Sequence, residues 1–467
     1  MRRCWFAVGT LVAAATWGGG LAAQQGLAPE LRQRIETSVR QVMDTTGVPS
    51  AQVGVVVNGR AVYTAAFGKA RLTPATPATV TMHYPVGSIT KQFTATCVLL
   101  LVEDGKMTLD DPVARWFPEL TRANDVTVRM LLSHTSGYSD YAPQDYTIPA
   151  WTRPTDPLKL VREWATKPLD FEPGTKWQYS NTNFVLAALI VERASGEPFW
   201  SFLKKRVLDP LELHEVLNLD TDRARVEPEG TERHALGPLR AATLEAPGWY
   251  FGDATLAMPV GDLLQWDISL MSEKLLKPES YKMLETEVLL KNGAPTGYGL
   301  GVQVSMRNGH RVISHSGEVG GFVAANMMMP DDHMAVAVLT NQEASSAAGA
   351  IATDVAGILE EAKPSNGTAA AEAQVMSMLN GLEDGKLDRS KLTGDCSYYF
   401  SAQTVGDFAE SLKPLGLVVE VKQTREQLRG GMTLRLFTVS FKSKRVTVST
   451  YTMPDGKLEQ FLVEAAE

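Results

Sequence analysis

Apolar and polar residues alternate in two short runs near the start of the chain, after a stretch with helical spacing. The helical spacing covers residues 30–43. The alternating runs cover residues 52–57 and 61–67, and Asn58-Gly59 separates them. Because Asn and Gly both accept positive φ, this dipeptide predicts a tight hairpin between two strands.

Four more strand-like runs lie far downstream, after a largely helical stretch with many loops. They cover residues 298–305, 311–315, 322–329 and 334–341, and a helical pattern over about 345–361 follows them. Strands at both ends of a region with a helical middle predict a mixed α/β (α+β) fold. In it, one antiparallel sheet is closed by both ends of the domain and flanked by helices.

The composition changes near Glu360, where Lys363, Pro364, Gly367 and an Ala-rich stretch favour a linker. We therefore expect a large domain over residues 27–361, a linker over 362–372 and a small domain over 373–467. Helical patterns over 371–382 and 405–412 precede strand-like runs over 417–423, 432–441, 445–451 and 458–463. These predict a small α+β domain with a curved antiparallel sheet. It carries no catalytic constellation, so its expected roles are packing, partner docking or shaping access to the main site.

The first residues indicate export. Arg2 and Arg3 precede a short apolar run that ends in Ala22 and Ala23, which is typical of a secretory signal peptide over residues 1–23. We therefore expect a periplasmic or secreted protein, with the Sec and twin-arginine routes both open. A membrane anchor is the alternative, but Gly residues interrupt the run and it is shorter than the roughly 20 apolar residues that span a bilayer.

Charge and cysteine content narrow the expected partners. The net charge is −8, and removal of the leader with Arg2 and Arg3 makes it about −10. An acidic chain without a basic stripe argues against nucleic acid, and no later segment predicts a membrane span. Cys97 lies in an apolar helical pattern, which favours a buried thiol over a bridge to Cys396. Since no Cys/His spacing resembles a metal site, we expect no metal and no organic cofactor.

The segment Ser88-Ile89-Thr90-Lys91 opens an apolar helical pattern and follows Gly87. Residues three apart share a helix face, so the lysine amine can reach the serine hydroxyl. Burial and the positive helix end both disfavour the ammonium form, which suits the lysine to act as a base for a nucleophilic serine. A second match, Ser201-Phe202-Leu203-Lys204, lacks the glycine and is explained by a solvated face.

Two further motifs follow in the chain. Tyr179-Ser180-Asn181 is the single Tyr-x-Asn, and it can supply a proton-relaying phenol and an amide that binds a carbonyl. His315-Ser316-Gly317 is the single His-x-Gly, at the end of an apolar strand run, where glycine lets a substrate lie along the strand edge. Each motif alone is more often structural, but the three in this order predict an acyl-transfer site.

These motifs resemble those of the serine β-lactamase and D,D-peptidase family, in the branch that holds class C β-lactamases, D,D-carboxypeptidases, D-amino-acid amidases and esterases. The similarity covers residues 27–360. It includes the residues around Ser88, the segment Leu131-Leu132-Ser133-His134-Thr135-Ser136-Gly137 and the segment Tyr298-Gly299-Leu300-Gly301. The resemblance implies a β-lactamase/transpeptidase-like fold and a serine hydrolase.

Carried over by motif, the resemblance implies that Ser88 is acylated, that Lys91 activates it and that Tyr179 shuttles protons. Asn181 would contact the acyl side chain. The substrate strand would be His315, Ser316, Gly317 and Glu318, and the backbone N–H groups of Ser88 and Glu318 would form the oxyanion hole. We interpret His134 as structural. Segments 138–153 and 219–250 are the expected walls and lids of the cleft.

The third motif departs from the class C pattern, which carries Lys-Thr-Gly. His315 replaces the lysine and is only partly charged near neutral pH, so it is a weaker partner for a substrate carboxylate. An esterase or D,D-peptidase is therefore favoured over a β-lactamase, and the expected substrate is a small ester, peptide or β-lactam. The alternatives are a non-catalytic scaffold or binding protein of the same fold, and a protein whose biological role lies in the C-terminal domain.

Overall fold

The computed structural model describes residues 26–362 and 366–465. The predicted signal peptide, residues 1–23, lies outside the described residues. The chain divides into two compact units, of which the first ends at Leu359 and the second begins at Glu360. Within the described part of the chain, no helix has the length and apolar character needed to cross a membrane.

The first unit is built on a seven-stranded antiparallel sheet with the order β3-β2-β1-β12-β11-β10-β9. The predicted hairpin is confirmed, because Asn58 and Gly59 both have positive φ between β1 and β2. The bounds of the strands are β1 (Ser50–Val57), β2 (Arg60–Arg71), β3 (Thr76–Pro77), β9 (Gln303–Arg307), β10 (His310–Val319), β11 (Phe322–Met329) and β12 (Met334–Thr340). The sheet thus joins strands from both ends of the domain, as the sequence predicted.

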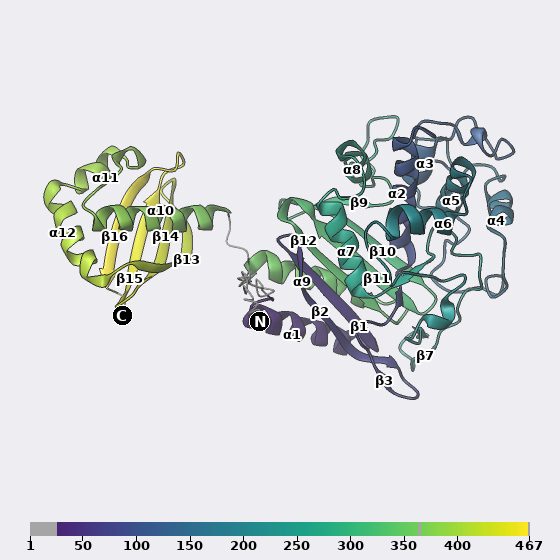
Figure 1. Cartoon of the computed structure of the whole chain (residues 1–467), viewed down its shortest axis with the longest axis horizontal. Helices are drawn as coiled ribbons and strands as arrows, with labels where there is room; N and C mark the ends of the chain where they lie inside the picture. Colours follow the sequence, from purple (N-terminus) through teal and green to yellow (C-terminus); the bar gives the residue numbers. More distant parts are fainter. Residues whose placement is uncertain (1–25, 363–365, 466–467) are drawn as a thin grey trace, which may run out of the picture. The chain divides into compact units, whose positions relative to one another are not determined.

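Alternate residues of the central strand β12 face two different hydrophobic cores. Val336 and Val338 share a core with residues of α1 (Pro29–Thr46) and α9 (Ala347–Ala362). These two helices lie on one face of the sheet (Figure 1). Ala337 and Leu339 belong to the larger core on the other face, which the helical middle of the chain covers. The helices of that middle region are α2 (Thr90–Glu103), α3 (Val128–Leu132), α4 (Pro157–Trp164), α5 (Asn181–Ser195), α6 (Phe199–Leu203), α7 (Val260–Met271) and α8 (Pro278–Glu285).

The second unit has its own core and a four-stranded antiparallel sheet with the order β13-β14-β15-β16. Its elements are α10 (Asn366–Glu383), α11 (Gly394–Tyr399), α12 (Ala402–Leu412), β13 (Val418–Arg429), β14 (Met432–Phe441), β15 (Arg445–Thr452) and β16 (Leu458–Ala465). Residues 366–372, expected in the linker, belong to α10, because their alanines favour a helix.

Three local expectations need correction. Residues 298–302 are not part of a strand: Leu300 N donates to Leu284 O and Gly301 N to Leu132 O, so this backbone bonds other segments and β9 starts at Gln303. The motif at His315 lies inside β10, which continues to Val319. Ser88 does not open the α-helix itself but lies in a short 3-10 turn before it. Cys97 is fully buried, as predicted, and both it and Cys396 are free thiols.

Candidate active site

Ser88 lies in the 3-10 turn η1 (Gly87–Ile89), and its side chain lines a cavity of about 640 Å³. Lys91 follows in the first turn of α2, and its side chain is completely buried. Its Nζ lies 2.8 Å from Ser88 Oγ. The spacing of three residues therefore places the amine against the hydroxyl, at a distance over which a proton can pass between them.

Three further groups surround the amine of Lys91. Its Nζ donates to Asn181 Oδ1 at 2.8 Å and to the backbone oxygen of Asp253 at 3.1 Å, and the Asp253 carboxylate lies 4.0 Å away. Burial lowers the pKa of Lys91 to about 8, while the charges of Asp253 and Asp140 oppose that shift. A substantial fraction of Lys91 is therefore neutral at slightly alkaline pH, as a base requires.

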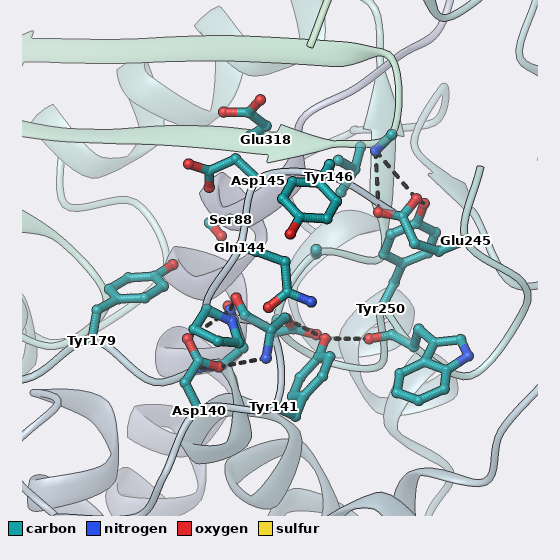
Figure 2. A pocket seen from close by; sticks show the side chains of 18 of the residues that line it. Ser88, Asp140, Tyr141, Gln144, Asp145, Tyr146, Tyr179, Glu245, Tyr250 and Glu318 are labelled. Carbon is teal, nitrogen blue, oxygen red and sulfur yellow. Dashed lines mark hydrogen bonds between the residues drawn. The ribbon is translucent and has the colours of Figure 1, made fainter. Parts of the chain in front are cut away.

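Tyr179 stands immediately before α5, whose first residue is Asn181. Figure 2 shows its hydroxyl turned toward Ser88. Burial raises the pKa of Tyr179 well above its ordinary value, and a hydrogen bond with the Ser88 side chain acts in the opposite direction. Lys91 Nζ lies 5.0 Å from the centre of the Tyr179 ring. Tyr179 is thus a protonated phenol in the position of a proton donor or relay.

The strand β10 passes directly over the turn that carries Ser88. A Cβ atom at Gly317 would overlap the carbonyl oxygen of Val86 and lie 2.9 Å from Ser88 N, and a Cβ at Gly87 would lie 2.5 Å from Glu318 N. Glycine at both positions therefore lets the N–H groups of Ser88 and Glu318 come together above the cavity. Two converging backbone donors beside a serine are the arrangement that stabilises an oxyanion.

One edge of β10 is open at this place. The strand β9 pairs with β10 from His310 to Ser314, whereas residues 315–319 pair with β11 on the other side. Ser316 is exposed, and Ser316 and Glu318 line the cavity. An extended substrate can lie against this edge.

Both ring nitrogens of His315 are occupied by the protein itself. Nε2 lies 2.8 Å from the Tyr298 hydroxyl, and Nδ1 is hydrogen-bonded to the backbone oxygen of Ser316. Burial, followed by the charge of Lys91, lowers the pKa of His315 to about 4. His315 is therefore neutral above pH 5 and offers no cation to a substrate.

The cavity is acidic and aromatic, and none of the described residues that line it is Lys or Arg. Figure 2 shows the segment with Tyr141, Gln144, Asp145 and Tyr146 beside Ser88, opposite Glu245 and Tyr250. Of the segments expected to form the walls, 138–153 lines the cavity at residues 140–147 and 151, whereas 219–250 lines it only at Glu245, Trp249 and Tyr250. The carboxylates that line the cavity are Asp140, Asp145, Glu245, Asp253, Glu318 and Glu343. Burial raises the pKa of Glu343 to about 7, and Glu232, Glu245 and Glu318 add to the shift.

The structure brings the residues of all three sequence motifs to one cavity, and it adds residues that no motif contained. Asp140 accepts a hydrogen bond from Asn181 N at 2.9 Å. Asp253 contacts Lys91, and Tyr298 contacts His315. Asp140 and Asp253 had no local sequence signal, because only the fold brings them to the helix that carries Lys91. His134 is buried beside Tyr179, with its ring centre 4.3 Å away, which agrees with a structural role.

The chain is similar to several known proteins. The family model "Beta-lactamase" matches residues 35–359. "Penicillin-binding protein 4*" of Bacillus subtilis is 28% identical over 337 residues, which cover 67% of this chain and 73% of that protein. A "D-aminopeptidase" of Cereibacter sphaeroides is 28% identical over 320 residues, covering 67% of this chain and 61% of that protein.

Solved structures with the same fold include a D-stereospecific amidohydrolase from Streptomyces sp., at a TM-score of 0.59 and 28% identity, covering 68% of this chain and 96% of that one. A penicillin-binding protein homologue from Pyrococcus abyssi has a TM-score of 0.61 at 20% identity and covers 92% of this chain and 99% of that one. The matched family model spans most of the chain and includes every motif residue described above. The protein therefore belongs to the beta-lactamase family and is a serine hydrolase.

Proposed function

We propose that this protein is an exported hydrolase that cleaves an amide or ester bond through a seryl-acyl intermediate on Ser88. The observation that carries the proposal is the 2.8 Å contact between Lys91 Nζ and Ser88 Oγ in a buried site that lowers the pKa of the lysine. We propose export because residues 1–23 have the sequence pattern of a secretory signal peptide.

In this mechanism neutral Lys91 takes the Ser88 proton while the serine oxygen attacks the substrate carbonyl. The N–H groups of Ser88 and Glu318 hold the oxyanion that forms. When the scissile bond breaks, Tyr179 passes a proton to the leaving group and is reprotonated from Lys91. Water then attacks the acyl-enzyme, and the proton it releases returns through the same groups to Ser88.

The charges of the cavity favour a substrate that carries a protonated amine over one that carries a carboxylate near the scissile bond. Six carboxyl groups line the cavity, and burial raises the pKa of four of them: Asp140, Asp253, Glu318 and Glu343. None of the described lining residues is Lys or Arg, and His315, which stands in the place of a lysine, is neutral. A substrate carboxylate would meet like charges, whereas an ammonium group would be attracted. Relatives named D-aminopeptidase and D-stereospecific amidohydrolase support an amide of a D-amino acid with a free amine. An ester with the same amine is the second substrate type.

The test compares D-alanine p-nitroanilide with its N-acetyl and N-succinyl derivatives. The free amine should give the highest kcat/KM, with at least about a tenfold loss on acetylation and a larger loss on succinylation. Ser88→Ala should reduce turnover by about a thousandfold or more. Ser201→Ala is the matched control, because Ser201 in α6 and Lys204 in the turn that follows repeat the Ser-x-x-Lys spacing, and both are exposed.

Three outcomes would overturn parts of this proposal. Equal turnover by wild type and Ser88→Ala would exclude the acyl-enzyme. Faster turnover of the succinyl derivative, or a stable adduct with penicillin, would place the protein with carboxylate-binding enzymes. If the folded protein turns over no ester or amide, the remaining interpretation is a scaffold or binding protein of this fold.

A further inference from the structure

Asp253 is a buried acid next to Lys91 that belongs to none of the three motifs. It lies just before β8 (Leu256–Met258), is 2% exposed and lines the active-site cavity. Its backbone oxygen accepts from Lys91 Nζ at 3.1 Å, and its carboxylate Oδ2 lies 4.0 Å from the same nitrogen. Asp253 thus lies against the amine of Lys91 with both its backbone oxygen and its carboxylate.

The carboxylate of Asp253 is fixed in place by a second contact. The single proton of the Tyr141 hydroxyl is shared between Oδ2, at 3.0 Å, and the backbone oxygen of Trp249. Within the described residues, Oδ1 has no hydrogen-bond partner. Burial raises the pKa of the Asp253 carboxyl to about 7, whereas a nearby cation and the hydrogen bond with Tyr141 oppose this shift. Lys91 is the cation at that distance.

We propose that Asp253 is a positioning residue: its backbone oxygen holds Lys91 Nζ in place, and the ionised form of its carboxylate favours the charged form of the lysine. The inference rests on the proposed function, in which Lys91 first takes the proton of Ser88 and later returns it. In each step one O–H bond and one N–H bond exchange.

The need for such a charge follows from the burial of Lys91. Burial alone lowers the pKa of a lysine, in extreme cases by several units, and an amine of very low pKa is a weak base. Opposite charge nearby acts against this effect. With Asp253 and Asp140 present, the pKa of Lys91 is about 8, close to the pH at which an exported enzyme works.

The other titratable groups around Lys91 and Asp253 are two histidines, a tyrosine and a second acid. His134 and His315 have pKa values lowered by burial and by the charge of Lys91, so they are neutral. Tyr179 has a raised pKa and is protonated. Asp140 is the second negative group, but its oxygens bind the backbone N–H groups of Asn181 and Ala142, and its effect on the pKa of Lys91 is smaller than that of Asp253.

The direct test is a titration of Lys91 by NMR in the full chain labelled with [ε-13C]lysine, with Lys91→Met identifying the signal. Asp253→Asn should lower the pKa of Lys91 by at least about one unit. Asp267→Asn is the matched control: Asp267 is also fully buried and bonded to one amide, Asn326 Nδ2 at 2.6 Å, but the acids that act on the pKa of Lys91 are Asp253 and Asp140. It should leave the titration unchanged.

Activity provides the second readout. The acid limb of kcat/KM for Ser88-dependent turnover should move to lower pH in Asp253→Asn, whereas a residue of purely structural role would lower kcat/KM at every pH without moving the limb. Tyr141→Phe should move the limb in the same direction by a smaller amount, because the Tyr141 hydrogen bond favours the ionised form of Asp253. If Asp253→Asn does not fold, the position of the acid limb in Tyr141→Phe tests the role of Asp253 instead.

An unchanged Lys91 titration in the folded variants would overturn the role of Asp253 and leave the proposed function untouched. Wild-type turnover that does not depend on Ser88 would overturn the proposed function instead. The NMR titration would still measure the effect of Asp253 on the pKa of Lys91. If Asp253→Glu keeps the acid limb of kcat/KM at the wild-type pH, the result would support an effect of the negative charge.

Discussion

The hydroxyl of Tyr298 lies 2.8 Å from His315 Nε2 and 3.3 Å from His134 Nε2, so one phenol connects the two histidines of the site. His134 Nδ1 accepts from Ser180 N, which leaves the proton on Nε2 to be donated to Tyr298. Tyr298 then donates to His315 Nε2, and His315 Nδ1 donates to the oxygen of Ser316. Every donor in this chain has an acceptor when both histidines are neutral.

Tyr298→Phe should therefore destabilise the protein and reduce its activity. It leaves His134 and His315 each with a buried, unpaired Nε2, which costs about 1–3 kcal/mol per group. We expect a lower Tm and a lower kcat/KM. Tyr281→Phe is the control, because the Tyr281 hydroxyl accepts from Leu275 N at 2.9 Å and lies outside the cavity. It should lower Tm and leave kcat/KM unchanged. Equal loss of activity in both variants would contradict the prediction.

Gly317→Ala tests the close approach of β10 to Ser88. The added methyl would overlap the Val86 carbonyl oxygen, so strand and turn must separate and the N–H groups of Ser88 and Glu318 must move apart. Loss of one oxyanion donor costs about 10²–10³ in kcat. We expect a loss of this size in steady-state kinetics. Gly349→Ala, in α9 where a Cβ has open space, is the control. Full activity of Gly317→Ala would show that β10 can shift without harm.

The features that the sequence predicted well depend on residues close together in the chain. The hairpin at Asn58-Gly59 and the contact of Lys91 with Ser88 each follow from a short spacing and a backbone preference. Phe322–Met329, a nearly continuous apolar run, and Met432–Phe441, which alternates toward its end, match their predicted strands because both patterns are local.

The features that the sequence did not predict depend on distant contacts. Asp253 is 162 residues from Lys91, and no spacing marks the pair. The segment at Tyr298 has the composition of a strand, but its N–H groups find partners on other segments, so tertiary contacts override the local preference. The acidic character of the cavity is likewise invisible in the net charge, because it depends on which acids the fold gathers.

Glu343 should make stability depend on pH. Its pKa is raised from 4.5 to about 7 in the folded state, mainly by burial, so the folded protein binds its proton more tightly than the unfolded chain does. The stabilisation from this group is complete below pH 4.5 and is lost as the pH rises through about 7. Glu343→Gln should therefore flatten the decrease of Tm between pH 5 and pH 7.5. The same slope in the variant would assign the effect to other acids.

His315→Lys should move substrate preference toward carboxylates. The lysine would place a cation at the cavity beside β10, where the neutral His315 now uses both nitrogens internally. At about 4 Å an opposite charge contributes about 1–4 kcal/mol, depending on the local dielectric. We expect kcat/KM for the N-succinyl substrate, relative to the free amine, to rise at least about tenfold. His315→Gln is the control, because it loses the imidazole without adding charge. An equal change in both variants would show that lost hydrogen bonds with Tyr298, rather than the missing cation, set the preference of the wild-type enzyme.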